Sequence, residues 1–294
     1  MNAVSRLDAL AKSNPEWSAW LRVVREVVSE LSNPAWDADP PSTVASSDLA
    51  PWLAGAQLRP DGRALAQLLD RLISTAHAQG IHALTGGEKK PRANPVDEAR
   101  AIFLAAVNGD HAALDGRATS TGASLEGLRS LAHLLSMPYL HACARSWALN
   151  PDARWSQGYC PVCGSWPAFA ELRGIERTRH LRCGRCGVGW PMLVLTCTYC
   201  ATTAHETLGT LVVDDTKSRF ALDVCHGCSG YLKSCTTLQA TPSDELIGVD
   251  LESVEFDITA VERGFLRPSG PGAALRASLE AIEQPPPAAS RGWW

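Results

Sequence analysis

The sequence predicts an α+β protein of several domains: a mostly helical N-terminal part, a small β-rich part with two cysteine modules in tandem, and a C-terminal helix. Apolar residues recur at helical spacing over about the first 150 residues, eight of the ten cysteines stand in four Cys-x-x-Cys steps, and helical spacing returns after Ser243. We expect a helical domain over residues 1–150, a first four-cysteine module over 151–194, a second over 195–240, a helical segment over 241–283 and a disordered tail over 284–294.

Proline and asparagine mark where the predicted N-terminal helices begin and end. Asn14-Pro15 is a typical helix start, and an apolar face follows until Asn33-Pro34. The stretches 37–47 and 86–92 are predicted to be loops. Further helices are predicted from Pro60-Asp61 to before Gly80, from Asn94-Pro95 to Asn108-Gly109, and from about Leu125, where Pro138 bends or breaks the last one.

The four Cys-x-x-Cys steps are the strongest signal in the chain. Two residues between cysteines on a tight turn place both sulfurs on the same side of the backbone, so two such turns supply a tetrahedral metal site. Nineteen residues separate the first step from the second, and twenty-four separate the third from the fourth, which are lengths that suit β-hairpins. Only ten residues separate the second step from the third. This favours pairing the first step with the second and the third with the fourth, with an interleaved pairing as the alternative. The predicted ligands are Cys160, Cys163, Cys183, Cys186, Cys197, Cys200, Cys225 and Cys228.

Strand-forming residues lie inside the second proposed site. Leu208 to Val213 is one such run, Asp214-Asp215 is a predicted turn, and apolar residues alternate from Phe220 to Val224. Hairpins between metal-binding turns are the architecture of zinc ribbons and rubredoxin-like modules. Because each hairpin has little core, we expect the metal to supply folding free energy on the order of 10 kcal/mol. Four thiolates accept either metal, so two ions of iron or zinc are expected per chain.

Disulfide bonds and a redox site are the alternatives to metal. Residues 1–11 lack the apolar run and cleavage site of a secretion signal, so an oxidising compartment is not expected. A redox Cys-x-x-Cys normally stands alone at a helix start, whereas this chain has four copies. Cys143 and Cys235 are left over, and we expect both to be buried or otherwise inert thiols.

Composition argues against several function classes. No segment reaches eighteen uninterrupted apolar residues, and the formal charge of −4 gives no general attraction to nucleic acid or anionic membranes. Between Trp155 and Ala240, eight Lys/Arg stand against six Asp/Glu. Each zinc ion bound by four thiolates adds about two negative charges, so two loaded sites would change this excess of two positive charges to a net charge of about −2. Nucleic-acid binders carry a basic stripe instead. A cytoplasmic protein with no nucleic-acid partner and no membrane insertion is expected.

No catalytic constellation is predicted, so we do not expect an enzyme. No Gly-x-Gly-x-x-Gly follows a strand, and no nucleophile, base and orienting residue can be assembled. His133 and His141 are expected to be ordinary helix residues. His205 and His226 are expected to be solvent-facing loop residues, with a spare ligand or a proton carrier as the alternative.

Several runs around the cysteines resemble one known family. These runs are Cys160-Pro161-Val162-Cys163-Gly164-Ser165-Trp166-Pro167, Leu181 to Gly187 with Trp190, Cys225-His226-Gly227-Cys228 followed by Gly230-Tyr231-Leu232-Lys233, and Gly264-Phe265-Leu266-Arg267-Pro268. Together they resemble the formate dehydrogenase accessory protein FdhE family, over nearly the whole chain. A generic zinc ribbon shares the first run but not the series.

The resemblance implies a helper that formate dehydrogenase needs for activity, one that binds the catalytic subunit of this molybdenum or tungsten enzyme before its export or assembly. It also implies rubredoxin-like iron binding at the eight matching cysteines. The sequence departs from the family pattern at Pro191–Thr196, which lacks the usual basic residue, and at Ser269–Gly272, where the family tends to Asn-Pro-Phe. A nucleic-acid-binding zinc ribbon and a rubredoxin-like electron carrier are the alternative functions, and self-association stays open.

Overall fold

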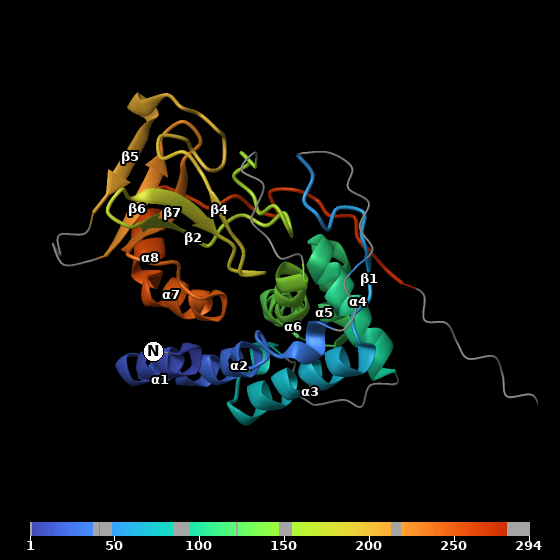
Figure 1. Cartoon of the computed structure of the whole chain (residues 1–294). Helices are drawn as coiled ribbons and strands as arrows, with labels where there is room; N and C mark the ends of the chain where they lie inside the picture. Colours follow the sequence, from blue (N-terminus) through green and yellow to red (C-terminus); the bar gives the residue numbers. More distant parts are fainter. Residues whose placement is uncertain are drawn as a thin grey trace, which may run out of the picture.

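The computed structural model has the predicted α+β architecture, with a group of helices beside a β-sheet (Figure 1). It describes residues 2–37, 41, 49–84, 94–121, 123–146, 155–212 and 219–280. Much of the predicted loops at 37–47 and 86–92, the Asp214-Asp215 turn and the tail from 284 lie outside the described residues. We call residues 2–146 the helical region and residues 155–280 the sheet region.

The helical region contains six α-helices among its described residues, and all six contribute to one hydrophobic core. They are α1 (Ala3–Ser13), α2 (Ser18–Val28), α3 (Gly62–Ala78), α4 (Pro95–Asn108), α5 (His111–Thr121) and α6 (Leu125–Ser146). Short 3-10 turns are η1 (Pro15–Trp17), η2 (Pro34–Asp37) and η3 (His82–Leu84). Within the described residues, no helix combines the length and apolar character that crossing a bilayer requires.

Capping explains where two of these helices begin. The side chain of Asp61 accepts two backbone N–H hydrogen bonds at the start of α3, and that of Asn94 accepts one at the start of α4. The predicted end at Asn108 is also confirmed, because Gly109 takes a left-handed φ of 66° that terminates α4.

The N-terminal helices differ from the prediction in two ways. The sequence pattern did not indicate α1 or α5, and α5 carries only a weak apolar stripe in which Leu114 and Ala118 are buried. The predicted helix after Asn14-Pro15 begins as a 3-10 turn and α2 ends at Val28, five residues before Asn33. Tertiary packing, more than periodicity, therefore sets these elements.

One of the two outcomes predicted at Pro138, a break in the helix, is wrong, because α6 continues through it to Ser146. Proline removes one intrahelical hydrogen bond and crowds the preceding turn. Every residue from Leu134 to Cys143 is buried, so packing on all sides holds the helix together across that defect.

The predicted single C-terminal helix is also wrong. After the 3-10 turn η5 (Ser243–Glu245), the chain forms α7 (Leu246–Glu252) and α8 (Val254–Glu262), separated at Ser253. The buried Ser253 hydroxyl donates to the carbonyls of Val249 and Asp250, which competes with regular helix bonding there. Ile258 and Val261 share the apolar three-four spacing that predicts this helix, but both are more than half exposed.

One six-stranded sheet forms the sheet region. Its strands are β2 (Phe169–Arg173), β3 (Thr178–Arg182), β4 (Gly189–Pro191), β5 (Leu208–Leu211), β6 (Phe220–Cys225) and β7 (Gly230–Thr237), in the order β4-β3-β2-β7-β6-β5, and η4 (His205–Thr207) precedes β5. The antiparallel strands β2–β4 surround the first two Cys-x-x-Cys steps, and β5–β7 surround the last two. The parallel pairing of β2 with β7, from Phe169↔Lys233 to Arg173↔Thr237, joins both units into one sheet.

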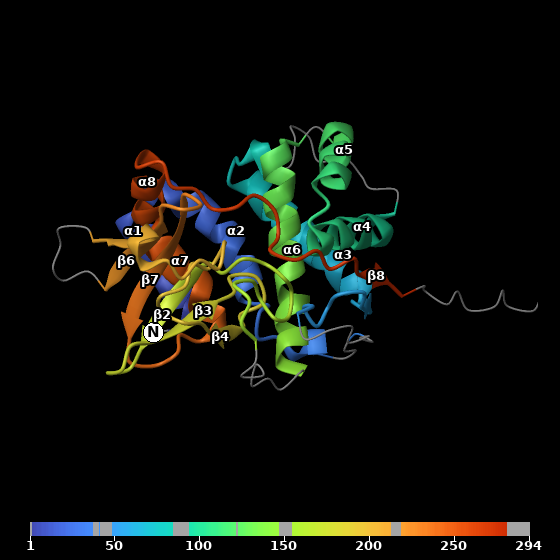
Figure 2. The same cartoon turned by 90° about the horizontal axis from the view of Figure 1, so that it is seen from above.

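The two regions contact one another at several places. Helices α7 and α8 pack under the sheet, and α7 contacts α1 (Figure 1). Residues 265–280 form a strap that crosses back to the helical region, visible as the red segment in Figure 2. The strap ends in β8 (Ser278–Leu279), which pairs in parallel with β1 (Gln57–Leu58). The Asn108 side chain also donates to and accepts from the backbone of Ala277.

Candidate metal centres

The eight cysteines form two groups of four. The first cluster contains Cys160, Cys163, Cys183 and Cys186, and the second cluster contains Cys197, Cys200, Cys225 and Cys228. Within each cluster all four sulfur atoms lie within 4.8 Å of one another. The grouping predicted from the gap lengths is therefore confirmed, and the interleaved alternative is not found.

Each Cys-x-x-Cys step forms the same tight turn, which we call a knuckle. In the first knuckle the N–H of Val162 donates to Cys160 Sγ at 3.4 Å, and the third knuckle repeats this contact from Tyr199 to Cys197 Sγ. The residue after the second cysteine has a positive φ in all four knuckles, at Gly164, Gly187, Ala201 and Ser229. This left-handed residue reverses the chain and lets the two sulfurs converge.

The sulfur spacing fits tetrahedral coordination. Metal–sulfur bonds of about 2.3 Å arranged in a tetrahedron place the sulfurs about 3.8 Å apart. The closest cross-knuckle contacts are 3.5 Å in the first cluster, and 3.7 and 3.8 Å in the second. A disulfide bond requires about 2.05 Å, so these cysteines are free thiols and the disulfide alternative is excluded.

The first cluster is buried inside the core that the helices share. Each of its cysteines is at most 1% exposed, and the cluster packs with α6 residues. Burial raises the pKa of the Cys160 and Cys186 thiols well above the usual value. The pKa of Cys163 lies well below it, because contacts from the other three sulfurs stabilise its thiolate and the charge of Arg185 adds to this effect.

The second cluster lies at the far end of the sheet, and half of it is open to solvent. Cys197 and Cys225 are buried, whereas Cys200 and Cys228 are exposed. Tyr199 covers one side, since its hydroxyl donates to the Tyr231 carbonyl and its ring packs edge-on against Trp166. Solvent or another molecule can therefore approach two of its four cysteines directly.

The remaining cysteines and the histidines stay outside both clusters. Cys143 and Cys235 are buried free thiols as predicted, and burial raises their pKa values to about 12 and about 11. His205 and His226 are exposed, and the His226 ring lies against Phe265. His141 is buried in α6, where burial and then the charge of Arg145 lower its pKa to about 3, and His133 lines a cavity described below.

A buried ion network connects two of the runs that carry the family resemblance. Lys233 is fully buried, and its ammonium group lies 2.6 Å from a carboxylate oxygen of Asp250 and 2.6 Å from one of Asp257. Asp257 also accepts hydrogen bonds from Tyr231 and Arg267, each at 2.9 Å. Sequence reasoning missed both aspartates. A lysine directly after the apolar pair Tyr231-Leu232 in a strand was the available signal, because a buried ammonium needs an acidic partner.

A second buried pair stabilises the hairpin of the first cluster. The Glu171 carboxylate is fully buried on β2, 3.0 Å from the Arg182 guanidinium on β3. Burial by itself would raise the Glu171 pKa, but the charge of Arg182 and hydrogen bonds from Thr241 and Arg173 outweigh it and lower the pKa. Glu171 is therefore ionised at neutral pH and fixes β2 against β3.

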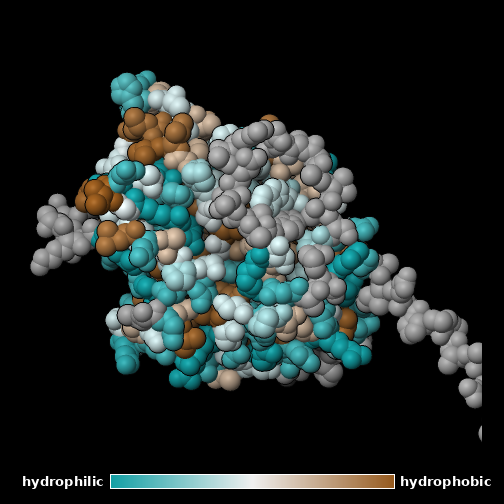
Figure 3. Space-filling view, in the orientation of Figure 1, coloured by the Kyte–Doolittle hydropathy of each residue, from teal (hydrophilic) through white to brown (hydrophobic). Residues whose placement is uncertain are grey.

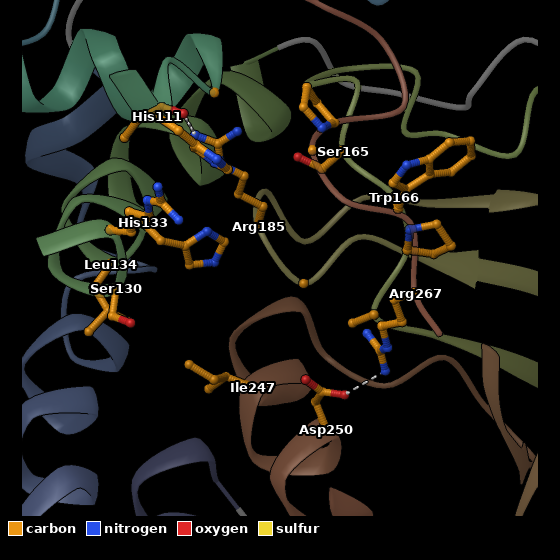
Figure 4. A pocket seen from close by; sticks show the side chains of 18 of the residues that line it. His111, Ser130, His133, Leu134, Ser165, Trp166, Arg185, Ile247, Asp250 and Arg267 are labelled. Atoms are coloured by element: carbon orange, nitrogen blue, oxygen red, sulfur yellow. Dashed lines mark hydrogen bonds and ion pairs between the residues drawn. The ribbon is translucent and has the colours of Figure 1, made fainter. Parts of the chain in front are cut away.

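A cavity of about 640 Å³ lies where the two regions meet, beside the first cluster (Figure 4). Helical residues form one wall, the first two knuckles another, and α7 with the strap the third. Representative lining residues are Trp20, Leu134, Trp166, Arg185, Ile247 and Arg267. The regions are thus not packed continuously along their contact.

Comparison with known proteins identifies relatives. No protein-family model matches the chain. The chain is 29% identical over 120 residues to "Protein FdhE homolog" of Aquifex aeolicus, covering 39% of this chain and 41% of that protein. It is 32% identical over 141 residues to "Protein FdhE homolog" of Pseudomonas putida, covering 44% and 43%. The matches thus span about two fifths of the length of these curated relatives.

The fold also matches a solved structure over nearly its whole length. The crystal structure of the FdhE protein from Pseudomonas aeruginosa aligns with a TM-score of 0.57 at 21% identity, covering 93% of this chain and 94% of the other. At this identity the match establishes the shared fold. The two sequence matches confirm the resemblance predicted from the cysteine runs.

Proposed function

We propose that this chain, a relative of the FdhE proteins, is a non-catalytic assembly factor for formate dehydrogenase. In this role it binds the catalytic subunit of that molybdenum or tungsten enzyme in the cytoplasm and carries two tetrathiolate metal sites. The single observation that carries the proposal is the pair of four-cysteine clusters in an FdhE-like fold. Their sulfur spacing supports metal binding, because it is close to what a tetrahedral ion requires.

Either zinc or iron fits this donor set. Four thiolates and no nitrogen or oxygen ligand are typical of structural zinc and of rubredoxin-type iron. The first cluster would hold one ion inside the core, where it joins the hairpin of β2 and β3 to the helices. The second cluster would hold the other ion between β5–β7 and the third knuckle. Zinc would make both sites structural, whereas iron would add one-electron chemistry.

Exposed apolar side chains support a protein partner on the sheet region. Leu193, Val194 and Leu195 are each at least 59% exposed directly before the second cluster, and Val212 and Leu266 are also exposed. On the face seen in Figure 3, hydrophobic residues gather over the sheet, while the surface of the helices is mostly hydrophilic. Groups of exposed apolar residues on soluble domains commonly mark contacts with other proteins. Leu193–Leu195 also lie in the stretch that departs from the family pattern.

The test has two parts. Elemental analysis of the purified chain should return close to two ions of zinc plus iron per chain. The tagged chain should also retain the formate dehydrogenase catalytic subunit from an extract, and a strain lacking the chain should lose formate dehydrogenase activity. Absence of both metals would refute the metal sites, and full activity in the deletion strain would refute the assembly role.

A rubredoxin-like electron carrier is the second candidate, favoured by the exposure of Cys200 and Cys228. Exposure brings a redox-active iron within reach of a partner. The iron-loaded chain should then show a reversible one-electron couple that disappears when Cys197 and Cys200 are replaced by serine. A redox-silent iron form would eliminate this candidate and leave the assembly role intact.

A further inference from the structure

The side chain of Arg185 connects the first cluster to the helical region. Arg185 lies in the second knuckle, between Cys183 and Cys186, and is only 8% exposed. Its guanidinium donates to the Ala106 carbonyl at 2.5 Å and to the Ser136 hydroxyl at 3.3 Å, with a longer contact to the Val107 carbonyl. Figure 4 shows Arg185 extending beside the cavity toward the helices that carry His111 and His133. One side chain thus joins a knuckle to α4 and α6.

Arg185 differs from the other buried arginines in its partners. Arg179, Arg182 and Arg185 are the buried arginines among the described residues. Arg179 pairs with Asp223 and Arg182 pairs with Glu171, but no carboxylate of the described residues pairs with Arg185. A buried guanidinium without an anion is destabilising. A different source of negative charge must therefore compensate Arg185.

Two sources of negative charge lie beside it. The carbonyls of Ala106 and Val107 belong to the C-terminal turn of α4, where the helix dipole places partial negative charge. The second source is the first cluster, because Arg185 lies in its second knuckle, between Cys183 and Cys186. Four thiolates around a divalent ion carry a net charge of about −2. Metal loading would thus place the stronger counter-charge in the knuckle that carries Arg185.

We infer that Arg185 is a positioning residue through which metal loading of the first cluster fastens α4 and α6 to the sheet region. The inference rests on the proposed metal binding. The loaded cluster holds the guanidinium by charge, and the guanidinium in turn holds the end of α4 and Ser136 by hydrogen bonds. The neighbouring cavity interrupts the packing beside Arg185, so in the metal-free chain the contact of the second knuckle with α4 and α6 is loosened.

Hydrogen–deuterium exchange of the full-length chain tests this inference. The reporter segments are 102–109 at the end of α4 and 131–138 in α6, and segment 65–76 of α3 is the internal reference. In the wild type, loading with Zn(II) should slow exchange in both reporter segments by about tenfold or more relative to α3, as charge-assisted hydrogen bonds would. Zinc-loaded Arg185→Gln should exchange in these segments like the metal-free wild type.

Arg129→Gln is the matched control. Arg129 lines the same cavity from α6 but is paired with Asp115 at 2.6 Å, so its loss should leave the zinc-dependent protection intact. Wild-type protection in an Arg185→Gln chain that binds two zinc ions would overturn the inference. A wild type that binds no metal would refute the proposed function itself.

If the Arg185→Gln chain does not bind two zinc ions, Arg185→Lys is used in its place. Lysine keeps the charge but cannot reach two carbonyls and Ser136 at once. Zinc-loaded Arg185→Lys should therefore exchange at rates between those of the loaded and metal-free wild type. Full wild-type protection in the Arg185→Lys chain would also overturn the inference.

Discussion

The two cysteine clusters share their knuckle geometry but differ in everything around it. The first cluster is buried in the same core as the helices, whereas two of the four cysteines of the second are exposed at the edge of the sheet. The left-handed residue of each knuckle is glycine in the first cluster and alanine or serine in the second. A Cβ on Gly164 would lie 2.5 Å from the Ala273 carbonyl, and one on Gly187 would lie 2.7 Å from Ser243 Cβ.

This contrast indicates that the motif sets the ligand geometry and the surroundings set the role. The strap, α6 and two knuckles meet at the first cluster, so losing its metal should destabilise both regions of the chain. The second cluster belongs to strands at the periphery, where another protein or an electron can reach it. Five experiments test this division.

The largest difference should come from removing ligand pairs. Replacing Cys160 and Cys163 by serine removes an ion whose binding contributes on the order of 10 kcal/mol to folding, comparable to the total stability of about 5–15 kcal/mol of a domain. We expect the helices to form still, but their melting transition in circular dichroism should fall far below that of the wild type. The Cys197 and Cys200 double serine variant should retain one ion and a helical melting transition close to that of the wild type. Equal destabilisation by both pairs would contradict the division.

Removing a buried ion pair should likewise destabilise the chain more beside the first cluster than beside the second. Glu171→Gln leaves Arg182 without its carboxylate and should cost about 3–5 kcal/mol of unfolding free energy in denaturant titrations. Asp223→Asn in the second half should cost only about 1–3 kcal/mol, because the Asp223 side chain is 31% exposed whereas that of Glu171 is fully buried.

The contribution of Glu171 should also depend on pH. Its pKa is lowered in the folded chain, so the ionised carboxylate stabilises the fold above the ordinary glutamate pKa of about 4.3. This stabilisation is lost as pH falls through the lowered folded value, and the difference between wild type and Glu171→Gln should shrink over that acidic range. A difference that stays constant down to pH 2 would contradict the assignment.

Metal release should occur in two phases. A chelator can approach the exposed Cys200 and Cys228 directly, but it can reach the first cluster only after the core opens. In a chelator assay we expect one ion per chain to leave quickly and the second to leave with the rate of unfolding. In the Cys197 and Cys200 double serine variant the fast phase should be missing. Release of both ions in one phase would mean that burial does not protect the first site.

The smallest effects concern the left-handed residues. A non-glycine residue in this conformation is strained by roughly 1–2 kcal/mol, partly offset by the extra entropy that glycine loses on folding. Ala201→Gly and Ser229→Gly should therefore stabilise the second cluster by about 0.5–1 kcal/mol in thermal melts. Gly187→Ala should destabilise the chain, because its Cβ would also lie 2.8 Å from the His141 ring.

The sequence predicts the parts of this molecule that depend on local chemistry. The knuckles, their grouping, the hairpins between them and the capped helix starts at Asp61 and Asn94 all follow from spacing and turn residues. The parts that depend on distant contacts were not predictable. No pattern places Arg185 against Ala106, 79 residues away, and no local signal pairs β2 with β7 in parallel.

The same reasoning explains the errors in the helices. Pro138 and the 254–262 segment are judged correctly only when their neighbours are known, because packing keeps α6 intact and the break at Ser253 separates α7 from α8. Asp250 and Asp257 are unremarkable in the sequence and become important only beside Lys233. Residue spacing therefore identified the cysteine ligands, whereas the buried ion pairs of the sheet region could be identified only from the fold.

The pairing of β1 with β8 has a consequence for biosynthesis. Gln57 and Leu58 leave the ribosome long before Ser278 and Leu279, which are translated after every cysteine of both clusters. Domains generally fold from the N-terminus as they are made, so the helices can assemble early, while β1 stays unpaired until β8 has been synthesised. The strap can close over the helices only on a nascent chain whose ligands have already emerged, which allows metal capture to precede the final closure.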